Sequence, residues 1–213
     1  MTPKLSPEDA AVSELLLRHA CPVSFAHARA FVMGSIACPT ETVSAQTVIR
    51  ALWHGDPPEF KVAVEAHGFA ELLIDNFWNS LLVHQDRGRP FTLLRGSCSP
   101  TMRHMGRYAR IRWEEVAGFF DGLCGPDDDL VLPSRANRAL DALNEMTPLL
   151  EGLAKLSLTR SEKIQHAEVK LMIRQIDELT EIAEKEMNAA IQACGRTRIN
   201  RVISLSGSRT RLN

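Results

Sequence analysis

Apolar residues recur at every third or fourth position from Val169 to Cys194, near the C-terminus of the 213-residue chain. The mean spacing is close to the 3.6 residues of a helical turn, so this stretch predicts one long amphipathic helix. Thr159 and Glu162 match a capping box before it, and Gly195 is a typical helix stop. Its apolar seam comprises Val169, Met172, Ile176, Leu179, Ala183 and Met187. Such a helix either packs across the whole domain or projects and pairs with a partner.

Capping residues, glycines and prolines divide the preceding chain into shorter helices. Ser6, Ser24 and Ser44 stand at expected helix starts, where a hydroxyl group accepts a hydrogen bond from a first-turn N–H. Helices are predicted over residues 7–20, 24–37, 44–53, 62–83, 113–123, 134–146 and 148–156. Gly34 indicates close packing of a neighbouring helix, and the broad apolar face of 62–83 indicates a central position in the core. The predicted fold is all-α, a multi-helix orthogonal bundle with a long C-terminal amphipathic helix.

Three parts are expected along the chain: a helical domain over 1–156, the long helix over 157–195 and a basic tail over 196–213. With 45% hydrophobic residues, a chain of this length can bury its own core without disulfides or metals. Its five cysteines show no CxxC spacing and are typical of a reducing compartment. Every apolar stretch is shorter than the roughly 18 residues that span a bilayer. We therefore expect a cytoplasmic protein without a membrane partner.

Residues 86–110 contain several glycines and prolines, which predict an irregular segment, with a short strand pair as an alternative. This segment is basic, and a second basic stretch follows Gly195, although the net charge of the chain is only −1. The candidate anion- or partner-binding residues are Arg87, Arg89, Arg95, Arg103, Arg107, Arg110, Arg196, Arg198 and Arg201. If the two stretches converge, they form a patch for phosphates or an acidic partner; otherwise they are a solvated surface.

Two sequence blocks resemble a known family. The first is AFVMGSIACP at 30–39, followed by ALWHG at 51–55, and the second is WEEVAGFFDGL at 113–123. Together they are similar to the YecA/YgfB-like family of small bacterial helical proteins, over roughly residues 24–155. The cysteine-rich zinc tail of many such proteins is replaced here by the long helix and the arginine tail. The resemblance implies a bacterial cytosolic α-helical domain with an interaction or regulatory role, and it carries over no catalytic residue.

Other residue groups offer alternatives for chemistry. Motifs for nucleotide phosphates, zinc proteases and serine nucleophiles are not found in the sequence. Glu71, Asp75 and a distant histidine would suit a metal, and the acidic turn 127–129 would attract a cation. Cys98 would be an activated thiol if the arginines lowered its pKa and His104 served as its base. For each group an ordinary structural or solvated role is favoured, and no cofactor is expected.

The leading hypothesis is a non-enzymatic helical interaction or regulatory protein. It would contact a protein partner, or a second copy of itself, through the C-terminal helix. The alternative is a nucleic-acid- or ribosome-associated protein that binds through the arginine-rich segments 87–110 and 196–211. An enzyme would need a pocket with converging histidine, cysteine or carboxylate groups, which these spacings do not predict.

Overall fold

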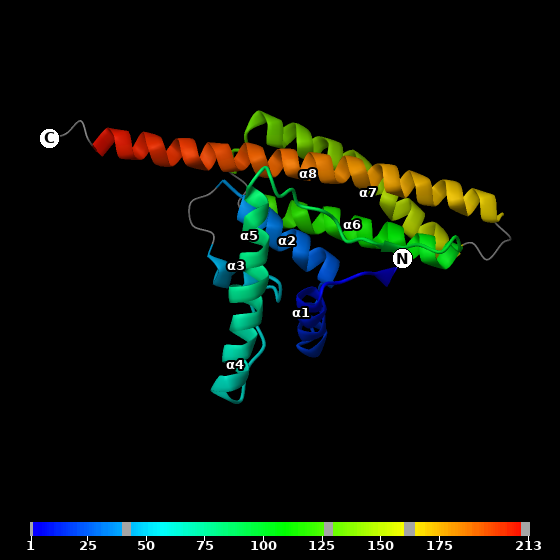
Figure 1. The fold of residues 1–213 in the computed structure, drawn as a ribbon, viewed down its shortest axis with the longest axis horizontal. Coiled ribbons are helices and arrows are strands. Elements are labelled where there is room, and N and C mark those ends of the chain that lie inside the picture. Colours follow the sequence, from blue (N-terminus) through cyan, green and yellow to red (C-terminus); the bar gives the residue numbers. More distant parts are fainter. Residues whose placement is uncertain (1, 40–43, 126–129, 160–164, 210–213) are drawn as a thin grey trace.

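The computed structural model describes residues 2–39, 44–125, 130–159 and 165–209 and confirms the predicted all-α bundle with a long C-terminal helix (Figure 1). The α-helices are α1 (Pro7–Arg18), α2 (Phe25–Ala37), α3 (Ala45–Ala51), α4 (Ala63–Ala70), α5 (Asn79–Leu82), α6 (Met102–Cys124), α7 (Ser134–Thr159) and α8 (His166–Arg209). A π-helical segment, η1 (Glu71–Trp78), joins α4 to α5, and a 3-10 turn, η2 (Val83–Gln85), follows. Two short antiparallel strands, β1 (Thr2–Pro3) and β2 (Gly96–Ser97), pair near the N-terminus.

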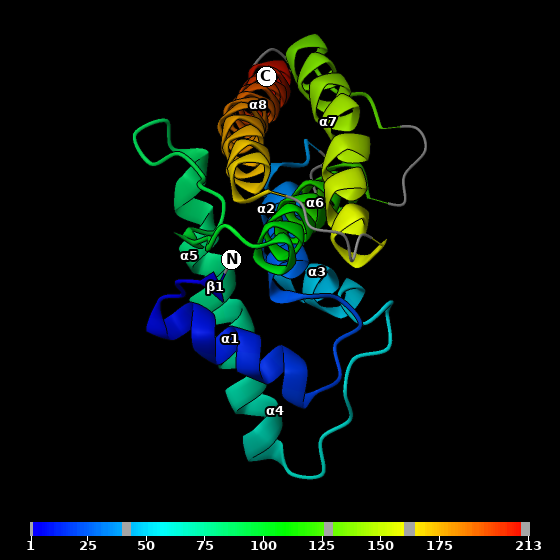
Figure 2. The same cartoon turned by 90° about the vertical axis from the view of Figure 1, so that its right-hand side faces the viewer.

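Helix α6 is the centre of the bundle. It packs against α2, α7 and α8, and Figure 2 shows these helices grouped around it. The sequence had favoured residues 62–83 for the central position, and this prediction was wrong. Among those residues only Leu73, Phe77 and Leu81 are buried, and α4 contributes no buried residue. In Figure 1 the rod formed by α4, η1 and α5 runs away from the bundle; η1 packs against the short helices α1 and α3, and α5 contacts α2.

Glycines let α2 and α6 approach closely. A Cβ atom on Gly34 would lie 2.4 Å from the carbonyl oxygen of Phe119, which confirms the close packing predicted from this mid-helix glycine. On the facing helix, a Cβ on Gly118 would lie 2.3 Å from the oxygen of His27, and one on Gly122 would lie 1.9 Å from that of Phe31. Both helices therefore require a residue without a side chain at the crossing.

The predicted N-terminal caps are present. The hydroxyl groups of Ser6, Ser24 and Ser44 accept hydrogen bonds from backbone N–H groups in the first turns of α1, α2 and α3. At the other end of α1, the indole Nε1 of Trp53 donates to the carbonyl oxygen of His19 at 3.0 Å. Local sequence and one long-range contact thus satisfy backbone groups that a helix end leaves without partners.

An extended strap, residues 90–95, crosses between α6 and α8. The side chain of Asn188 accepts a hydrogen bond from the N–H of Phe91 and donates to its carbonyl oxygen, both at 2.8 Å. The carboxylate of Glu184 accepts from the N–H of Leu93 at 2.7 Å. Phe91, Leu93 and Leu94 are buried. Side chains from neighbouring helices therefore take the place of a partner strand and hold the strap against the core.

The rest of the predicted irregular segment needs correction. Residues 86–101 are irregular apart from β2, but 102–110 are the first turns of α6. Thr101 caps this helix by accepting from the N–H of His104, and Gly106 lies inside it against Ser157 of α7. Packing explains the glycine, so it did not mark a break. The alternative of a strand pair within the segment was also wrong, because β2 pairs with β1.

Two predicted helix ends were wrong. Helix α7 continues through Pro148, where a break had been expected. Pro148 and Asn144 are both exposed, so water can satisfy the carbonyl group of Asn144 that the proline leaves without a donor. Helix α8 likewise continues through Gly195 to Arg209, and a Cβ atom on Gly195 would meet no atom within 4 Å. In Figure 1 the C-terminal end of α8 extends past the other helices.

The expected start of the last helix also moves. Thr159 is the last residue of α7 rather than a cap, and α8 begins at His166. Glu162, its predicted capping partner, lies outside the described residues. The expected divisions of the chain at 156 and 195 therefore fall inside α7 and α8.

Candidate functional site

The apolar seam of α8 faces the interior of the bundle. Val169, Ile176, Ala183 and Met187 are at most 2% exposed. The remaining seam residues, Met172 and Leu179, are partly buried and pack against the same core. The seam therefore packs across the domain and does not project to pair with a partner. The prediction that it forms an exposed surface for a partner was wrong, because α6 and α7 already cover it.

The predicted arginines separate into groups rather than forming one face. Arg95, the last residue of the strap, pairs with Glu184 at 2.7 Å. Arg198 is turned inward, where its guanidinium group donates to the carbonyl oxygens of Ile36 and Cys38 at the end of α2. These contacts neutralise a carboxylate and cap a helix, which are structural roles. Arg89 is exposed, and the side chain of Arg201 lies outside the described part of the chain.

Arg87 and Arg196 come together from the two basic segments. The Nε of Arg87 donates to the side-chain oxygen of Gln192 at 3.2 Å, and the Nε of Arg196 donates to its backbone oxygen at 3.1 Å. Both arginines are exposed. One arginine of each basic segment therefore contacts the same residue of α8.

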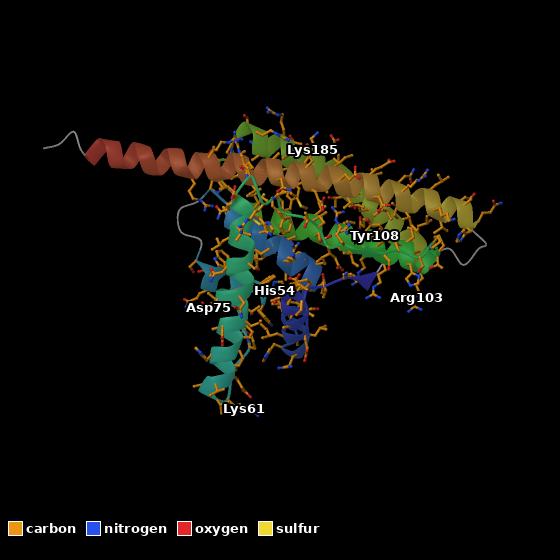
Figure 3. All side chains as sticks on the ribbon, in the orientation of Figure 1. His54, Lys61, Asp75, Arg103, Tyr108 and Lys185 are labelled. Carbon is orange, nitrogen blue, oxygen red and sulfur yellow. The ribbon has the colours of Figure 1, made fainter. Side chains whose placement is uncertain are left out.

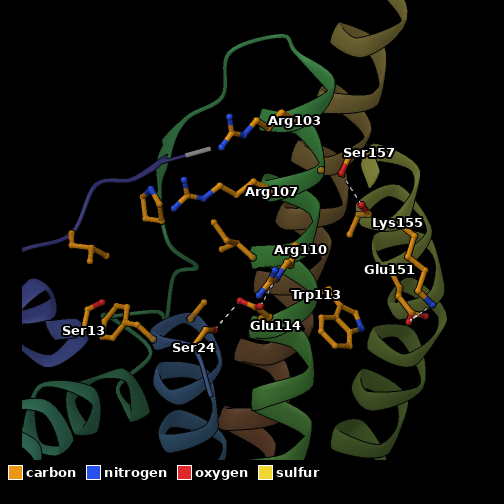
Figure 4. Close-up of a pocket in the computed structure, with 17 residues that line it drawn as sticks. Ser13, Ser24, Arg103, Arg107, Arg110, Trp113, Glu114, Glu151, Lys155 and Ser157 are labelled. Atoms are coloured by element: carbon orange, nitrogen blue, oxygen red, sulfur yellow. Dashed lines mark hydrogen bonds and ion pairs between the residues drawn. The ribbon is translucent and has the colours of Figure 1, made fainter. Parts of the chain in front are cut away.

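Arg103, Arg107 and Arg110 follow one another along one face of α6, in the turns before Glu114, where the start of α2 meets this helix (Figure 4). Residues separated by three or four positions lie on the same face of a helix. All three arginines are exposed, and they line a groove with a volume of about 880 Å³. The floor of this groove is α6, so a single helix positions its three arginines.

Two walls enclose the groove. One is made by β1 and the segment after it, by the middle of α1 and by the start of α2, and it includes Leu5, Phe25 and Ala26. The other is the end of α7, including Ala154 and Lys155. Ile111 and Trp113 add apolar surface from α6 itself. Side chains suited to an apolar ligand group therefore lie next to the arginines.

The charges in the groove are not balanced. Arg110 pairs with Glu114 at 2.8 Å, and Lys155 pairs with Glu151 at 2.6 Å. The second carboxylate oxygen of Glu114 accepts from the hydroxyl group of Ser24 at 2.8 Å, so Glu114 is held at the start of α2. Arg103 and Arg107 make no ion pair with an acid among the described residues. In Figure 4 their side chains extend from α6 to the same side. They leave a net positive charge at this end of the groove.

Among the described residues, the other predicted chemical groups do not form the expected metal site or activated thiol. Asp75 lies on the projecting rod, away from α6, α7 and α8 (Figure 3), and no cluster of three metal-binding side chains occurs among the described residues. Burial raises the pKa of the Cys98 thiol, contrary to the expected lowering by arginines. His104 is engaged with the hydroxyl group of Thr101 at 2.8 Å. The acidic turn 127–129 lies outside the described residues.

The structure brings together three cysteines that sequence spacing did not connect. Arg198 of α8 donates to the backbone of Cys38, which places Cys194, one turn earlier, beside the end of α2. Cys124 ends α6 close to both. Burial, with the neighbouring thiols, raises the pKa of Cys194 to about 12. A thiol with such a pKa is a poor nucleophile.

Sequence reasoning also missed a buried ion pair. Arg112 pairs with Glu115 on the side of α6 that faces the strap, and the carboxylate of Glu115 accepts from the N–H of Leu94 at 2.7 Å. The signal available was the i,i+3 spacing of opposite charges, but nothing in the sequence marks such a pair as buried.

Comparisons of the chain with protein-family models, with curated proteins and with solved structures found no match. The resemblance to the YecA/YgfB-like family therefore stays a prediction. Among the described residues, no helix is both long and apolar enough to cross a membrane.

Proposed function

We propose that this protein is a non-enzymatic helical interaction protein that binds a partner protein through the groove along α6. The observation that carries the proposal is the position of Arg103 and Arg107, which are exposed in the first turns of the central helix and lack an acidic partner among the described residues. Arginine is enriched at protein interfaces because its guanidinium group forms several directed hydrogen bonds. The apolar surface beside these arginines supplies the area that a specific contact needs.

That the protein is not an enzyme, and that its role is interaction or regulation, is proposed from the sequence motifs and the family resemblance. A scaffold of this kind suits binding, because α6 is fixed on three sides and presents its arginines from a rigid helix. We therefore place the contact surface on α6 and not on the seam of α8, which is buried.

Site-specific photo-cross-linking in a lysate of the source cells tests the proposal. A photoreactive residue replaces Lys155 at the rim of the groove, and a matched protein carries it at Glu181, an exposed position on α8. A discrete adduct is expected at 155 and not at 181, and it should disappear in the R103E/R107E background. If position 155 gives no specific adduct, or an adduct that charge reversal leaves unchanged, the groove is not the contact surface. Circular dichroism checks that each variant is folded.

A second candidate, binding of RNA or the ribosome, is favoured by the meeting of Arg87 and Arg196 at Gln192. Contacts of this kind to phosphates weaken steeply as salt displaces them. The R87E/R196E variant should then lose binding to a single-stranded RNA and show a smaller salt dependence than the unchanged protein. Equal binding by both proteins would remove this candidate.

A further inference from the structure

The groove along α6 carries information about the chemistry of its ligand. Its two pairs, Arg110–Glu114 and Lys155–Glu151, are each internally balanced. A ligand therefore meets two kinds of surface: the guanidinium groups of Arg103 and Arg107, which have no acidic partner among the described residues, and the apolar side chains on both walls.

The spacing of Arg103 and Arg107 sets the distance between the two ligand groups that can bind them. Residues four positions apart on a helix have Cβ atoms about 6 Å apart. Two carboxylates that match them must therefore be close neighbours on the ligand, as in side chains i and i+4 of a helix or i and i+2 of an extended peptide. A carboxylate binds the planar guanidinium group through two parallel hydrogen bonds.

The apolar part of the groove adds a second requirement. Phe25 and Ile111 are buried, whereas Leu5 and Trp113 are partly exposed and line the same groove. An apolar ligand side chain placed here would be removed from water and would be anchored next to the charged contacts.

The acidic side chains in the groove favour one class of negatively charged ligand over another. Glu114 lies about two helical turns from Arg107 and about three from Arg103 on α6, and Glu151 lies on α7, the facing wall. A nucleic-acid strand has a charge on every nucleotide and would bring some of its phosphates close to these carboxylates. A peptide can restrict its acids to the two positions that face Arg103 and Arg107. The charge pattern therefore favours a peptide over a nucleic acid.

We infer that the groove along α6 binds a short acidic peptide segment of another protein, with two neighbouring carboxylates on Arg103 and Arg107 and an apolar side chain against Phe25 and Ile111. This inference rests on the proposed function and names the class of partner segment.

The test is a selection of random dodecapeptides on the full-length protein, followed by binding measurements with the most enriched peptide carrying a fluorescent label. Paired acidic residues next to an apolar residue are expected among the enriched sequences. The labelled peptide should bind the R103E/R107E variant at least about tenfold more weakly than the unchanged protein, because two charge-assisted contacts are replaced by repulsion. Replacing its acids with the corresponding amides should weaken binding similarly.

A matched control is the R138E/R174E variant, which changes the same charge at two exposed arginines outside the groove and should bind the peptide as the unchanged protein does. The inference fails if no peptide is enriched, if the enriched peptides lack acids, or if R103E/R107E binds them equally well. It also fails if a 20-nucleotide single-stranded RNA displaces the peptide and binds more tightly. The cross-linking experiment separates this inference from the proposed function. If position 155 gives a specific adduct but the peptide test fails, the groove still binds a protein, and only the acidic peptide is excluded.

Discussion

The guanidinium group of Arg112 pairs with the carboxylate of Glu115 one turn further along α6, and both side chains are only 2% exposed. The pair also holds the strap, because Arg112 donates to the carbonyl oxygen of Leu94 while Glu115 accepts from the N–H of the same residue. Arg112 and Glu115 together therefore satisfy both backbone groups of one strap residue and join it to the central helix.

Replacing Arg112 and Glu115 together should lower the free energy of unfolding by less than the sum of the two single replacements. R112M or E115L leaves a buried charge or its hydrogen-bonding groups without a partner, for which we expect a loss of about 3–5 kcal/mol in the free energy of unfolding. The double variant R112M/E115L leaves no buried charge, so its loss should be clearly smaller than the sum of the two single losses. Urea denaturation of the four proteins measures these differences, and additive losses would contradict the prediction.

The exposed pair Arg18–Glu14 provides the control. Its side chains are 65% and 71% exposed. R18M should therefore change the free energy of unfolding by no more than about 1 kcal/mol.

Glu115 should also make stability depend on pH. Burial raises its pKa to about 7, although Arg112 lowers it. Between about pH 4.5 and pH 7 the folded protein keeps a proton that the unfolded chain has released, so the free energy of unfolding falls as pH rises through this window and levels off above it. A shift of this size corresponds to about 3 kcal/mol.

Denaturation of the unchanged protein and of E115Q from pH 4.5 to pH 8 tests this dependence. The unchanged protein should lose more stability with rising pH than E115Q does. Burial lowers the pKa of His27, which acts in the opposite direction below about pH 6.5. His27 is present in both proteins, so its effect cancels in the comparison, and parallel pH profiles would contradict the assignment to Glu115.

The crossing of α2 and α6 should not tolerate a methyl group. In G122A the new Cβ atom would overlap the backbone oxygen of Phe31, which cannot move without displacing α2. We expect a loss of about 3 kcal/mol in the free energy of unfolding. G152A is the control, because a Cβ atom there meets nothing within 4 Å and alanine favours the helix, so this variant should gain up to about 1 kcal/mol. A neutral G122A would show that the two helices are further apart.

Gly195 distinguishes a continuous α8 from a helix that stops. Because the residue lies inside the helix with open space around it, G195A should raise the free energy of unfolding by about 1 kcal/mol. If the chain instead used this glycine as a left-handed stop, alanine would be strained and the variant would be less stable. Thermal unfolding followed by circular dichroism gives the sign of the change.

Local signals predicted the three helix starts that a serine caps. The side chains of Ser6, Ser24 and Ser44 act on N–H groups only a few residues away, so their role can be read from the neighbouring sequence. Glycine and proline were less informative, because Gly106 and Gly195 lie inside helices and Pro148 lies within α7. Whether a glycine ends a helix or admits a neighbour depends on tertiary packing, which a single sequence does not display.

The candidate groove was likewise predicted only in part, because its residues come from both local and distant segments of the chain. Its arginines were predicted as candidates, but Arg103, Arg107 and Arg110 were assigned to an irregular loop, so their common helical face was missed. The walls come from α1, α2 and α7, which lie far from these residues in the sequence. Conversely, the regular seam of α8 was predicted correctly as an apolar face, but periodicity alone does not say whether a partner or the same chain covers it.

Side chains of α8 hold the strap through hydrogen bonds, so the number of residues in α8 fixes which side chains face the strap. Asn188 and Glu184 are one turn apart and meet Phe91 and Leu93, two residues apart on the extended strap. One residue inserted into α8 before Glu184 would rotate both side chains by about 100° relative to the seam that anchors the helix. Substitutions on the exposed side of α8 can therefore accumulate freely in related chains, whereas insertions and deletions between Val169 and Asn188 should be rare.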